Sequence, residues 1–321
     1  MRAYIGFEDT DILGAEVGTG KLVRRFEAFL PEGCCLWGVV RQQLLVDPRI
    51  PYTSHNSSAC AVVDFGDPAL RDELLARAMA HIERESYEGS DPGLCLACEG
   101  DAALKNLATL GLACTAQIVS RDEALRAAVG IHLSGHGGTC DGIIGAAAAV
   151  GLTALGWSGR FIEFNGLRDI PDQVRVGELE GRGIRVVSLD RDAVVPGEAD
   201  VVDTRGWLRP RLWGGGAVLP VRMREDHLWE SIGGKRKKTT ERKGGKDMAG
   251  KIFYRERRKV KEGEKKPRFK LVAVADADVK FYGDHLRKKE LEQIAGAIGA
   301  ELILLTHGGK EGRDEDVEVK N

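Results

Sequence analysis

Residues 135–151 read GHGGTCDGIIGAAAAVG, and this stretch is the part of the sequence that says most about the fold. Alanine has the highest helix propensity, so the alanine run favours a helix, and its small side chains let that helix pack very closely on a neighbour. The glycines before it form a turn into the helix, where free backbone N–H groups attract phosphate. Candidate phosphate-binding residues are Gly135, His136, Gly137, Gly138 and Thr139. A plain glycine-rich turn is the alternative, and the missing lysine excludes a P-loop.

Strands and helices are predicted on both sides of this helix. Apolar residues at steps of three and four favour an amphipathic helix at 68–87, and Ser120 with Glu123 forms a capping box that opens another helix. The other predicted elements are strands at 3–7, 36–46, 59–65, 114–119 and 160–164 and a helix at 101–110. This mixture predicts the α+β class.

Length and composition exclude several kinds of protein. The 321 residues suffice for about two domains, and no apolar run approaches the roughly 20 residues that a membrane-spanning helix needs. The early acids from Glu8 to Asp11 contradict a secretory signal, so we expect a cytoplasmic protein. The seven cysteines are an odd number and are expected to be buried thiols. The single pair Cys95 and Cys98 is likewise read as buried thiols, because structural zinc needs four ligands.

The net charge of −2 hides a strongly basic segment. Residues 235–270 hold 17 Lys/Arg against 5 Asp/Glu, a local charge of +12, so the rest of the chain carries −14. Such a stretch buries too little apolar surface to fold alone, and its cations suit the phosphates of RNA. The alternative is a solvated tether that only aids solubility. After it, residues 269–275, 284–298 and 301–306 predict a small β-α-β unit.

Two polar segments carry further candidates for chemistry. Glu8, Asp9 and Asp11 follow the first strand, and three carboxylates so close together repel one another unless a cation offsets them. Oxygen-rich sites of this kind suit Mg²⁺ that carries a nucleotide, while the alternative is a solvated acidic turn. The loop at 47–56, DPRIPYTSHN, is either a substrate loop or an ordinary connection between two strands.

Taken together, these motifs resemble the N-terminal half of the archaeal tRNA-Ile agmatinylcytidine synthetase family. The resemblance lies in the ordered set IGFEDTD (5–11), VRQQLLVDPRIPYTSHNSSACAVV (40–63), SDPGLCLA (90–97), HGGTCDGIIGAAAAVGL (136–152) and RLWGGG (211–216). It covers about residues 1–220 and implies a kinase-like domain plus a ferredoxin-like α/β domain. It also implies an enzyme that uses ATP and Mg²⁺ to activate a tRNA cytidine and then joins an amine to it.

The resemblance assigns roles to particular residues. Glu8, Asp9 and Asp11 match the family's acidic motif and would hold metal and triphosphate, with Glu8 in place of an aspartate, and Thr19 lies near the family's threonine pair. In the second motif Tyr52 replaces tryptophan. Thr53, His55 and Asn56 stand where the family has lysine, arginine and glycine; Tyr52, His55 and Asn56 are the expected substrate-binding residues. No cysteine follows Cys140, so the family's zinc ribbon is not expected here.

The sequence therefore predicts three regions: a synthetase-like catalytic region at 1–225, a basic arm or linker at 226–270, and a small C-terminal unit at 271–321. The expected activity is that of an ATP-dependent ligase or synthetase-like enzyme. Its cofactors would be ATP and Mg²⁺, its acceptor an RNA such as tRNA or a small molecule, and its co-substrate a small amine. The alternative is a non-catalytic homologue that binds RNA or assembles with partners through the arm. No membrane is implied, and the oligomeric state is left open.

Overall fold

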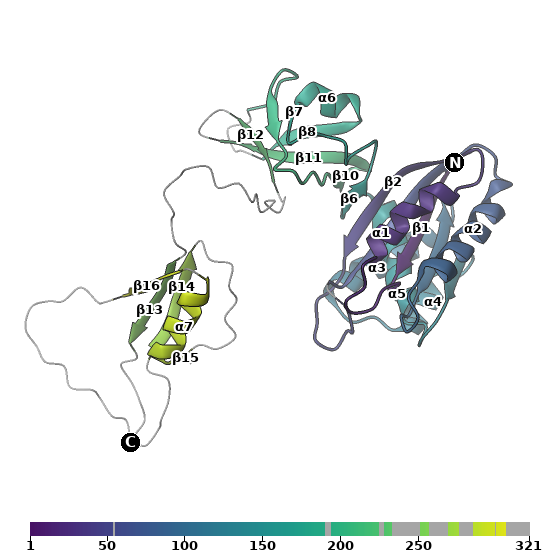
Figure 1. The fold of residues 1–321 in the computed structure, drawn as a ribbon. Coiled ribbons are helices and arrows are strands. Elements are labelled where there is room, and N and C mark those ends of the chain that lie inside the picture. The colour runs from purple at the N-terminus through teal and green to yellow at the C-terminus, as the bar shows by residue number, and fades with distance from the viewer. Residues whose placement is uncertain are drawn as a thin grey trace, which may run out of the picture. The chain divides into compact units, whose positions relative to one another are not determined.

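The computed structural model describes residues 1–53, 55–189, 194–224, 228–232, 251–256, 269–275, 285–298 and 300–305. The chain divides into two compact units, Met1–Lys238 and Thr239–Asn321. Figure 1 shows the elements of each. Within the part of the chain that is described, no helix is both long and apolar enough to cross a membrane.

An antiparallel sheet forms the centre of the first unit. Its strands lie in the order β5-β4-β1-β3-β2, and each is antiparallel to its neighbours. Their bounds are β1 Arg2–Glu8, β2 Cys34–Gln43, β3 Ser57–Phe65, β4 Gly93–Cys98 and β5 His132–Gly135. Consequently β1 and β2 end at the same edge of the sheet at which β3 and β4 begin.

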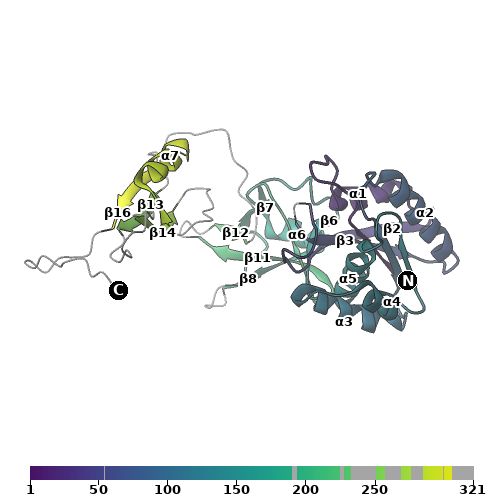
Figure 2. The same ribbon diagram turned by 90° about the horizontal axis from the view of Figure 1, so that it is seen from below.

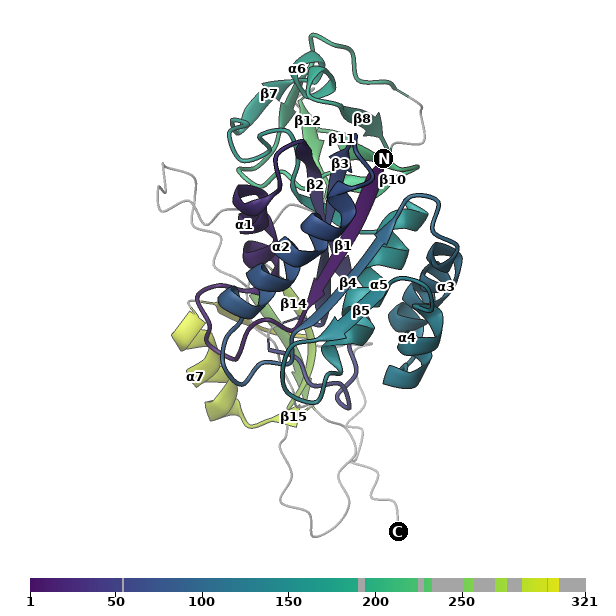
Figure 3. The same ribbon diagram turned by 90° about the vertical axis from the view of Figure 1, so that its right-hand side faces the viewer.

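Helices cover both faces of this sheet, as Figures 2 and 3 show. On one face Leu22, Phe26 and Leu74 pack against Ile5 and other strand residues. On the other face the buried cluster joins the strands to the helices that follow β4. The first face carries α1 Thr19–Arg25, the short 3-10 helix Phe26–Phe29 and α2 Leu70–Glu85; the second carries α3 Ala103–Ala116, α4 Arg121–Ala127 and α5 Gly142–Leu155.

Helix α5 lies very close to the sheet and to α3, as its alanines and glycines predict. A Cβ atom added at Gly6 on β1 would collide with the carbonyl oxygen of Ala146, and one at Gly93 on β4 would collide with the backbone of Gly142. At its other end, a Cβ on Gly151 would collide with the carbonyl of Leu107 in α3. Small residues are therefore required between 142 and 151, because the backbone of α5 packs against the sheet on one side and against α3 on the other.

The sheet continues into the second half of this unit. The order after β2 is β6-β10-β11-β12-β9-β7, and β8 pairs in parallel with β11. The bounds are β6 Arg160–Glu163, β7 Gln173–Arg175, α6 Val176–Gly181, β8 Ile184–Ser188, β9 Val201–Asp203, β10 Arg211–Trp213, β11 Gly216–Met223 and β12 Trp229–Ser231. A third core that includes Phe161, Leu219 and Trp229 stabilises this half.

In the described residues of the second unit, four strands form a sheet and are accompanied by one helix. Its strand order is β15-β14-β13-β16, and Ile252 and Tyr254 form a core with Leu291 and Ala295. The elements are β13 Lys251–Glu256, β14 Phe269–Ala275, β15 His285–Leu286, α7 Lys288–Ile298 and β16 Glu301–Leu304. The strand-helix-strand order predicted for residues 269–306 is present here, and the predicted α+β class is confirmed.

The structure corrects the predicted basic arm at two places. Strand β12 lies in the first unit although residues 226–270 were assigned to the arm, and β13 is a central strand of the second sheet. In β13 the apolar residues Ile252 and Tyr254 alternate with exposed or half-exposed neighbours and reach the core. The high density of Lys and Arg in residues 235–270 led to the prediction of an arm, although the apolar residues of β13 alternate as in a strand. The arm's last two residues, 269–270, begin β14, and its residues 226–227, 233–250 and 257–268 lie outside the described residues.

Two further predictions need correction. The strand expected at 114–119 is wrong, because α3 runs on to Ala116 and buries Cys114 on its inner side. The sequence GLCLAC at 93–98, for which no strand was predicted, is strand β4 and is buried along its whole length. Cys95 and Cys98 are free buried thiols, as predicted.

Candidate functional site

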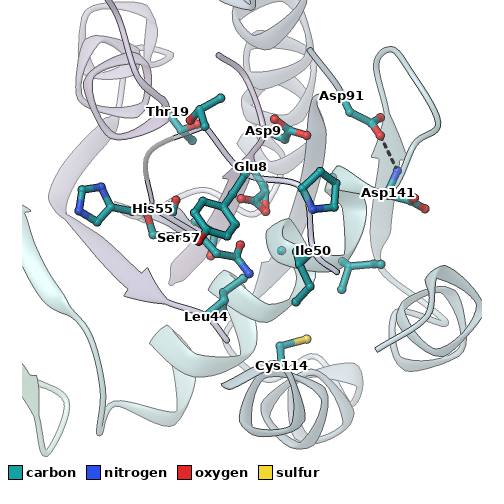
Figure 4. Close-up of a pocket in the computed structure, with 18 of the residues that line it drawn as sticks. Glu8, Asp9, Thr19, Leu44, Ile50, His55, Ser57, Asp91, Cys114 and Asp141 are labelled. Carbon is teal, nitrogen blue, oxygen red and sulfur yellow. Dashed lines mark hydrogen bonds between the residues drawn. The ribbon is translucent and has the colours of Figure 1, made fainter. Parts of the chain in front are cut away.

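A cavity of about 690 Å³ lies at the sheet edge where β1 ends. Its walls come from segments far apart in the sequence: the turn after β1, the start of α1, the loop between β2 and β3, the connection from α3 to α4, and the residues that lead into α5. Figure 4 shows Glu8 in the middle, Thr19 and His55 towards one side, and Asp91 and Asp141 on the other. The cavity thus joins four of the segments singled out in the sequence.

One end of the cavity is acidic. Burial raises the pKa of Glu8 to about 8, and the charges of Asp9 and Asp11 add to this shift. Burial, with Asp91 and Asp11, raises the pKa of Asp9 to about 6. Asp11 is shifted in the same direction by burial, although a hydrogen bond from Thr53 opposes the change in its pKa. These carboxylates face one another without enough positive charge between them.

The turn that holds these acids is fixed by hydrogen bonds. Asp9 adopts a left-handed backbone with φ of 51°, and its carbonyl oxygen accepts from the backbone N–H of Asp91 at 3.1 Å. Thr19, buried at the start of α1, accepts from the hydroxyl of Thr10 at 3.1 Å. Thr19 therefore lines the cavity and also supports the acidic turn.

Asp91 is a site residue that the sequence analysis missed. Its carboxylate accepts hydrogen bonds from the hydroxyl of Thr139 at 2.6 Å, the N–H of Cys140 at 2.7 Å and the N–H of Asp141 at 3.1 Å. The amides just before α5 are thus occupied by a carboxylate of the same chain. The sequence signal for Asp91 was the SDPG segment at 90–93, which the sequence analysis used only as part of the family resemblance.

The glycine-rich segment contributes less to the cavity than expected. Thr139 lines it, whereas Gly135, His136, Gly137 and Gly138 are not among its lining residues. A Cβ on Gly138 would lie 2.9 Å from the Asp91 side chain, so that glycine serves close packing on Asp91. The His136 ring contacts Ser134 at 2.8 Å and Glu83 at 3.0 Å.

Four basic side chains are among the lining residues of the cavity: Lys21, Arg41, Arg49 and Arg121. Arg41 donates to the hydroxyl of Ser57 at 3.0 Å. Arg121 donates to the carbonyl of Thr139 and lies 3.9 Å from a carboxylate oxygen of Asp141. The exposed Arg49 pairs with Asp47 at 2.8 Å. Positive charge is therefore available here, although the loop at 47–56 has Thr53 and His55 where the resembled family has cations.

The predicted substrate-binding residues occupy different positions in the cavity wall. Tyr52 is 44% exposed, and the ring of His55 points away from Glu8 in Figure 4. Asn56 is buried, and its amide donates to the carbonyl of Leu45 at 2.6 Å. The side chain of Asn56 thus holds the loop in place.

The deep wall of the cavity is largely apolar. Leu44, Cys114 and Ile144 contribute side chains there, and burial raises the pKa of Cys114 to about 12, which keeps this thiol neutral. Ser58 also lines the wall; its hydroxyl is fully buried and makes no hydrogen bond with any of the described residues. A buried polar atom without a partner is rare, so this hydroxyl suits a polar atom of a ligand.

The acidic end of the cavity supplies carboxylate oxygens, which are the donors that Mg²⁺ prefers. Among the described residues, no three His, Cys, Asp or Glu side chains converge closely enough to hold a metal ion by themselves. Mg²⁺ is usually bound through one or two carboxylates together with substrate phosphates. Asp9 and Asp11, which face the cavity without a cationic partner, fit that pattern, whereas a ligand set made only of Glu8, Asp9 and Asp11 is not preformed.

We expect the stability of the ligand-free protein to fall as the pH rises from about 4.5 to about 8. The folded state keeps the proton on Glu8 in this range, whereas the unfolded state releases it, so each step up in pH favours unfolding. Thermal melting between pH 5 and pH 8 measures this, and Glu8→Gln should flatten the curve. A melting temperature of the parent protein that is constant or rises would contradict the raised pKa.

The first unit is a layered α+β domain, and acidic and basic side chains line a cavity at one edge of its sheet. No family model and no curated protein sequence matches the chain. Among solved structures, a tRNA fluorescent labeling enzyme is 27% identical over 47% of this chain and 36% of its own, with a TM-score of 0.40. Apo TiaS, a tRNA-isoleucine agmatidine synthetase, is 25% identical over 47% and 35% of the two chains, with a TM-score of 0.39.

A third solved structure, TiaS in complex with its isoleucine tRNA and ATP, is 25% identical over 47% of this chain and 36% of its own, with a TM-score of 0.40. Both TiaS structures are thus similar to part of this chain. The present chain spans little more than a third of the length of these proteins.

Proposed function

We propose that this protein is an ATP- and Mg²⁺-dependent enzyme of the synthetase or kinase-like type, which activates an RNA or small-molecule acceptor. The observation that carries the proposal is the cavity itself. Its lining includes the carboxylates of Glu8, Asp9 and Asp11 and four basic side chains, and its volume of about 690 Å³ suits a nucleotide.

Each part of the cavity has a role in this proposal. Asp9 and Asp11 hold a magnesium ion, which when bound offsets the negative charge of the phosphates. Lys21 and Arg121 contact the phosphate oxygens, and the apolar wall near Leu44 and Ile144 accepts the base. An oxygen of the acceptor then forms a bond to a phosphorus of ATP while the bond from that phosphorus to the leaving phosphate breaks. Such chemistry depends on positioning and charge neutralisation and needs no nucleophile from the protein.

A specific observation supports a second candidate, a non-catalytic homologue that binds RNA. The loop at 47–56 has Thr53 and His55 where the resembled family has lysine and arginine, and Asn56 is used to hold the loop. In this case the cavity would have no catalytic role, and basic residues elsewhere in the chain would bind the RNA. An amine co-substrate belongs to the first candidate alone.

Isothermal titration of the full chain with ATP separates the two candidates. We expect a dissociation constant in the micromolar range with Mg²⁺, and affinity weaker by about tenfold or more when the metal is chelated, since the carboxylates then repel the triphosphate. No binding at millimolar ATP would reject the enzyme and leave the RNA-binding homologue.

A further inference from the structure

Four polar side chains form a continuous chain of hydrogen bonds at the β5 end of the sheet. His132, Ser134 and His136 occupy alternate positions along β5 and the residue after it, so they project from the same face of the sheet. The Ser134 hydroxyl lies 2.8 Å from Nε2 of each histidine. Nδ1 of His136 lies 3.0 Å from Oε1 of Glu83 on α2. We call these four residues the β5 hydrogen-bond chain, and none of them lines the cavity described above.

The donors and acceptors of this chain determine where its protons lie. A carboxylate only accepts hydrogen bonds, so the proton of the neutral His136 ring is on Nδ1, which donates to Glu83, and Nε2 is an acceptor. The Ser134 hydroxyl therefore donates to Nε2 of His136. The oxygen of the same hydroxyl accepts from the Nε2–H of His132. Burial lowers the pKa of His132, and the neighbouring His136 lowers it further, which favours the neutral ring that this assignment requires.

This arrangement is the one that activates a serine for nucleophilic attack. In such sites a nucleophile is hydrogen-bonded to a base, and a third group orients the base. Here Ser134 is the nucleophile, Nε2 of His136 is the base, and Glu83 orients the ring and stabilises its protonated form. The His136 side chain is only 5% exposed, so packing also holds the ring in this position.

The main chain beside Ser134 offers a donor for the negative oxygen that such an attack creates. The N–H of His136 donates to the carbonyl of Pro92, just before β4, at 2.7 Å. Because the direction of N–H groups alternates along an antiparallel strand, the N–H of Gly135 points away from β4. Among the described residues, β5 is the outermost strand at this end of the sheet. Gly135 is exposed and Ser134 is half-buried, so a small reactant can approach from this edge.

We propose that Ser134 is the nucleophile of a second site, which hydrolyses small carboxylic esters. Its Oγ forms a bond to the carbonyl carbon while the hydroxyl proton passes to Nε2 of His136, and the N–H of Gly135 donates to the carbonyl oxygen. The bond from that carbon to the alcohol oxygen breaks, and His136 gives the proton to the departing alcohol. A water molecule then attacks the acyl group and gives a proton to His136. The bond to Oγ breaks as this proton returns to Ser134.

The surroundings of Ser134 define the class of substrate. An open sheet edge holds a short acyl chain as well as a long one, so the site gains little from a large substrate. An ester is favoured over an amide because an alcohol departs more readily than an amine, and a single N–H donor stabilises the negative oxygen only in part. The site uses none of the residues that line the cavity, so its activity does not depend on the proposed function.

The first test is labelling of the full chain with a fluorophosphonate, whose phosphorus bonds to the oxygen of an activated serine as fluoride leaves. Mass spectrometry of the digested protein locates the label. Ser158 is the matched comparison, because it is half-buried in the same unit and its hydroxyl donates to the neutral amide of Gln42 at 3.0 Å. We expect Ser134 to react at least about a hundredfold faster than Ser158, since a positioned base contributes about 10²–10⁴-fold. His136→Gln should remove most of this advantage.

The second test is hydrolysis of p-nitrophenyl acetate. Ser134→Ala should lower the turnover at least about tenfold, whereas Ser158→Ala should match the parent. Glu83→Gln should lower kcat about tenfold with an unchanged KM, and Glu83→Asp should restore part of the loss, because a negative charge at this place orients the His136 ring. A purely structural Glu83 would change the melting temperature and leave kcat unaltered.

Two results overturn the proposal. One is equal labelling of Ser134 and Ser158 in the parent protein, which needs no variant and therefore decides even if a substituted protein fails to fold. The other is a folded Ser134→Ala protein that hydrolyses the ester as fast as the parent does.

Discussion

Replacing Asp9 and Asp11 together by asparagine is expected to weaken Mg²⁺-dependent ATP binding by about a hundredfold or more, while the protein remains folded. Even indirect support of a metal ligand is worth about 10–100-fold in affinity, so two direct ligands should exceed that range. Removal of clustered carboxylates also relieves their mutual repulsion, and the free energy of unfolding should stay level or rise. Titration calorimetry and thermal melting measure the two effects.

The matched control is Asp72→Asn/Asp122→Asn, which removes the same charge from exposed positions on α2 and α4. It should bind ATP and Mg²⁺ as the parent does. If the Asp9 and Asp11 variant also binds like the parent, these carboxylates do not hold the metal. If the variant unfolds instead, the carboxylates of Asp9 and Asp11 stabilise the folded state, and their mutual repulsion is not the dominant effect.

Gly151→Ala is expected to lower the free energy of unfolding by about 3 kcal/mol, at the upper end of what overpacking usually costs. The added methyl group would collide with the carbonyl carbon and oxygen of Leu107 and approach the N–H of Ala108. These are backbone atoms of α3 and cannot rotate away, so the two helices must separate. Denaturant unfolding followed by circular dichroism measures the loss.

Gly181→Ala is the control for that substitution. Gly181 closes α6, and an added Cβ there meets no atom within 4 Å. It should stabilise the protein by about 0.5–1 kcal/mol, because alanine loses less conformational entropy on folding than glycine does. Equal effects of the two variants would show that α5 and α3 are free to move apart.

Elements with a strong local signal were predictable from the sequence. Helix α2 follows from its repeated apolar spacing, the start of α4 from its capping box, and the close packing of α5 from its alanines and glycines. Strand β4 and strand β13 were not found, because each is short and carries another pattern: two cysteines in the first and a high density of cations in the second. Burial of those strands is decided by partners distant in the sequence, which no local pattern contains.

The same distinction applies to the candidate site. The acids after β1 and the loop at 47–56 were singled out, and the structure brings both to one cavity. Asp91 and Arg121 were not, because single charged residues have no periodicity and gain a role only through the fold. The glycines from Gly135 to Gly138 match a phosphate-binding pattern, yet Gly138 packs on Asp91. The Asp91 carboxylate accepts hydrogen bonds from the backbone N–H groups of Cys140 and Asp141, which follow the glycines.

The continuous sheet has a mechanical consequence. Strands β2 and β6 share three registered pairs, from Val39 with Glu163 to Arg41 with Arg160, so the cavity half and the half that carries β10 are joined by main-chain hydrogen bonds. A hinge between these halves would have to break that ladder. The two halves are therefore expected to move together as one body.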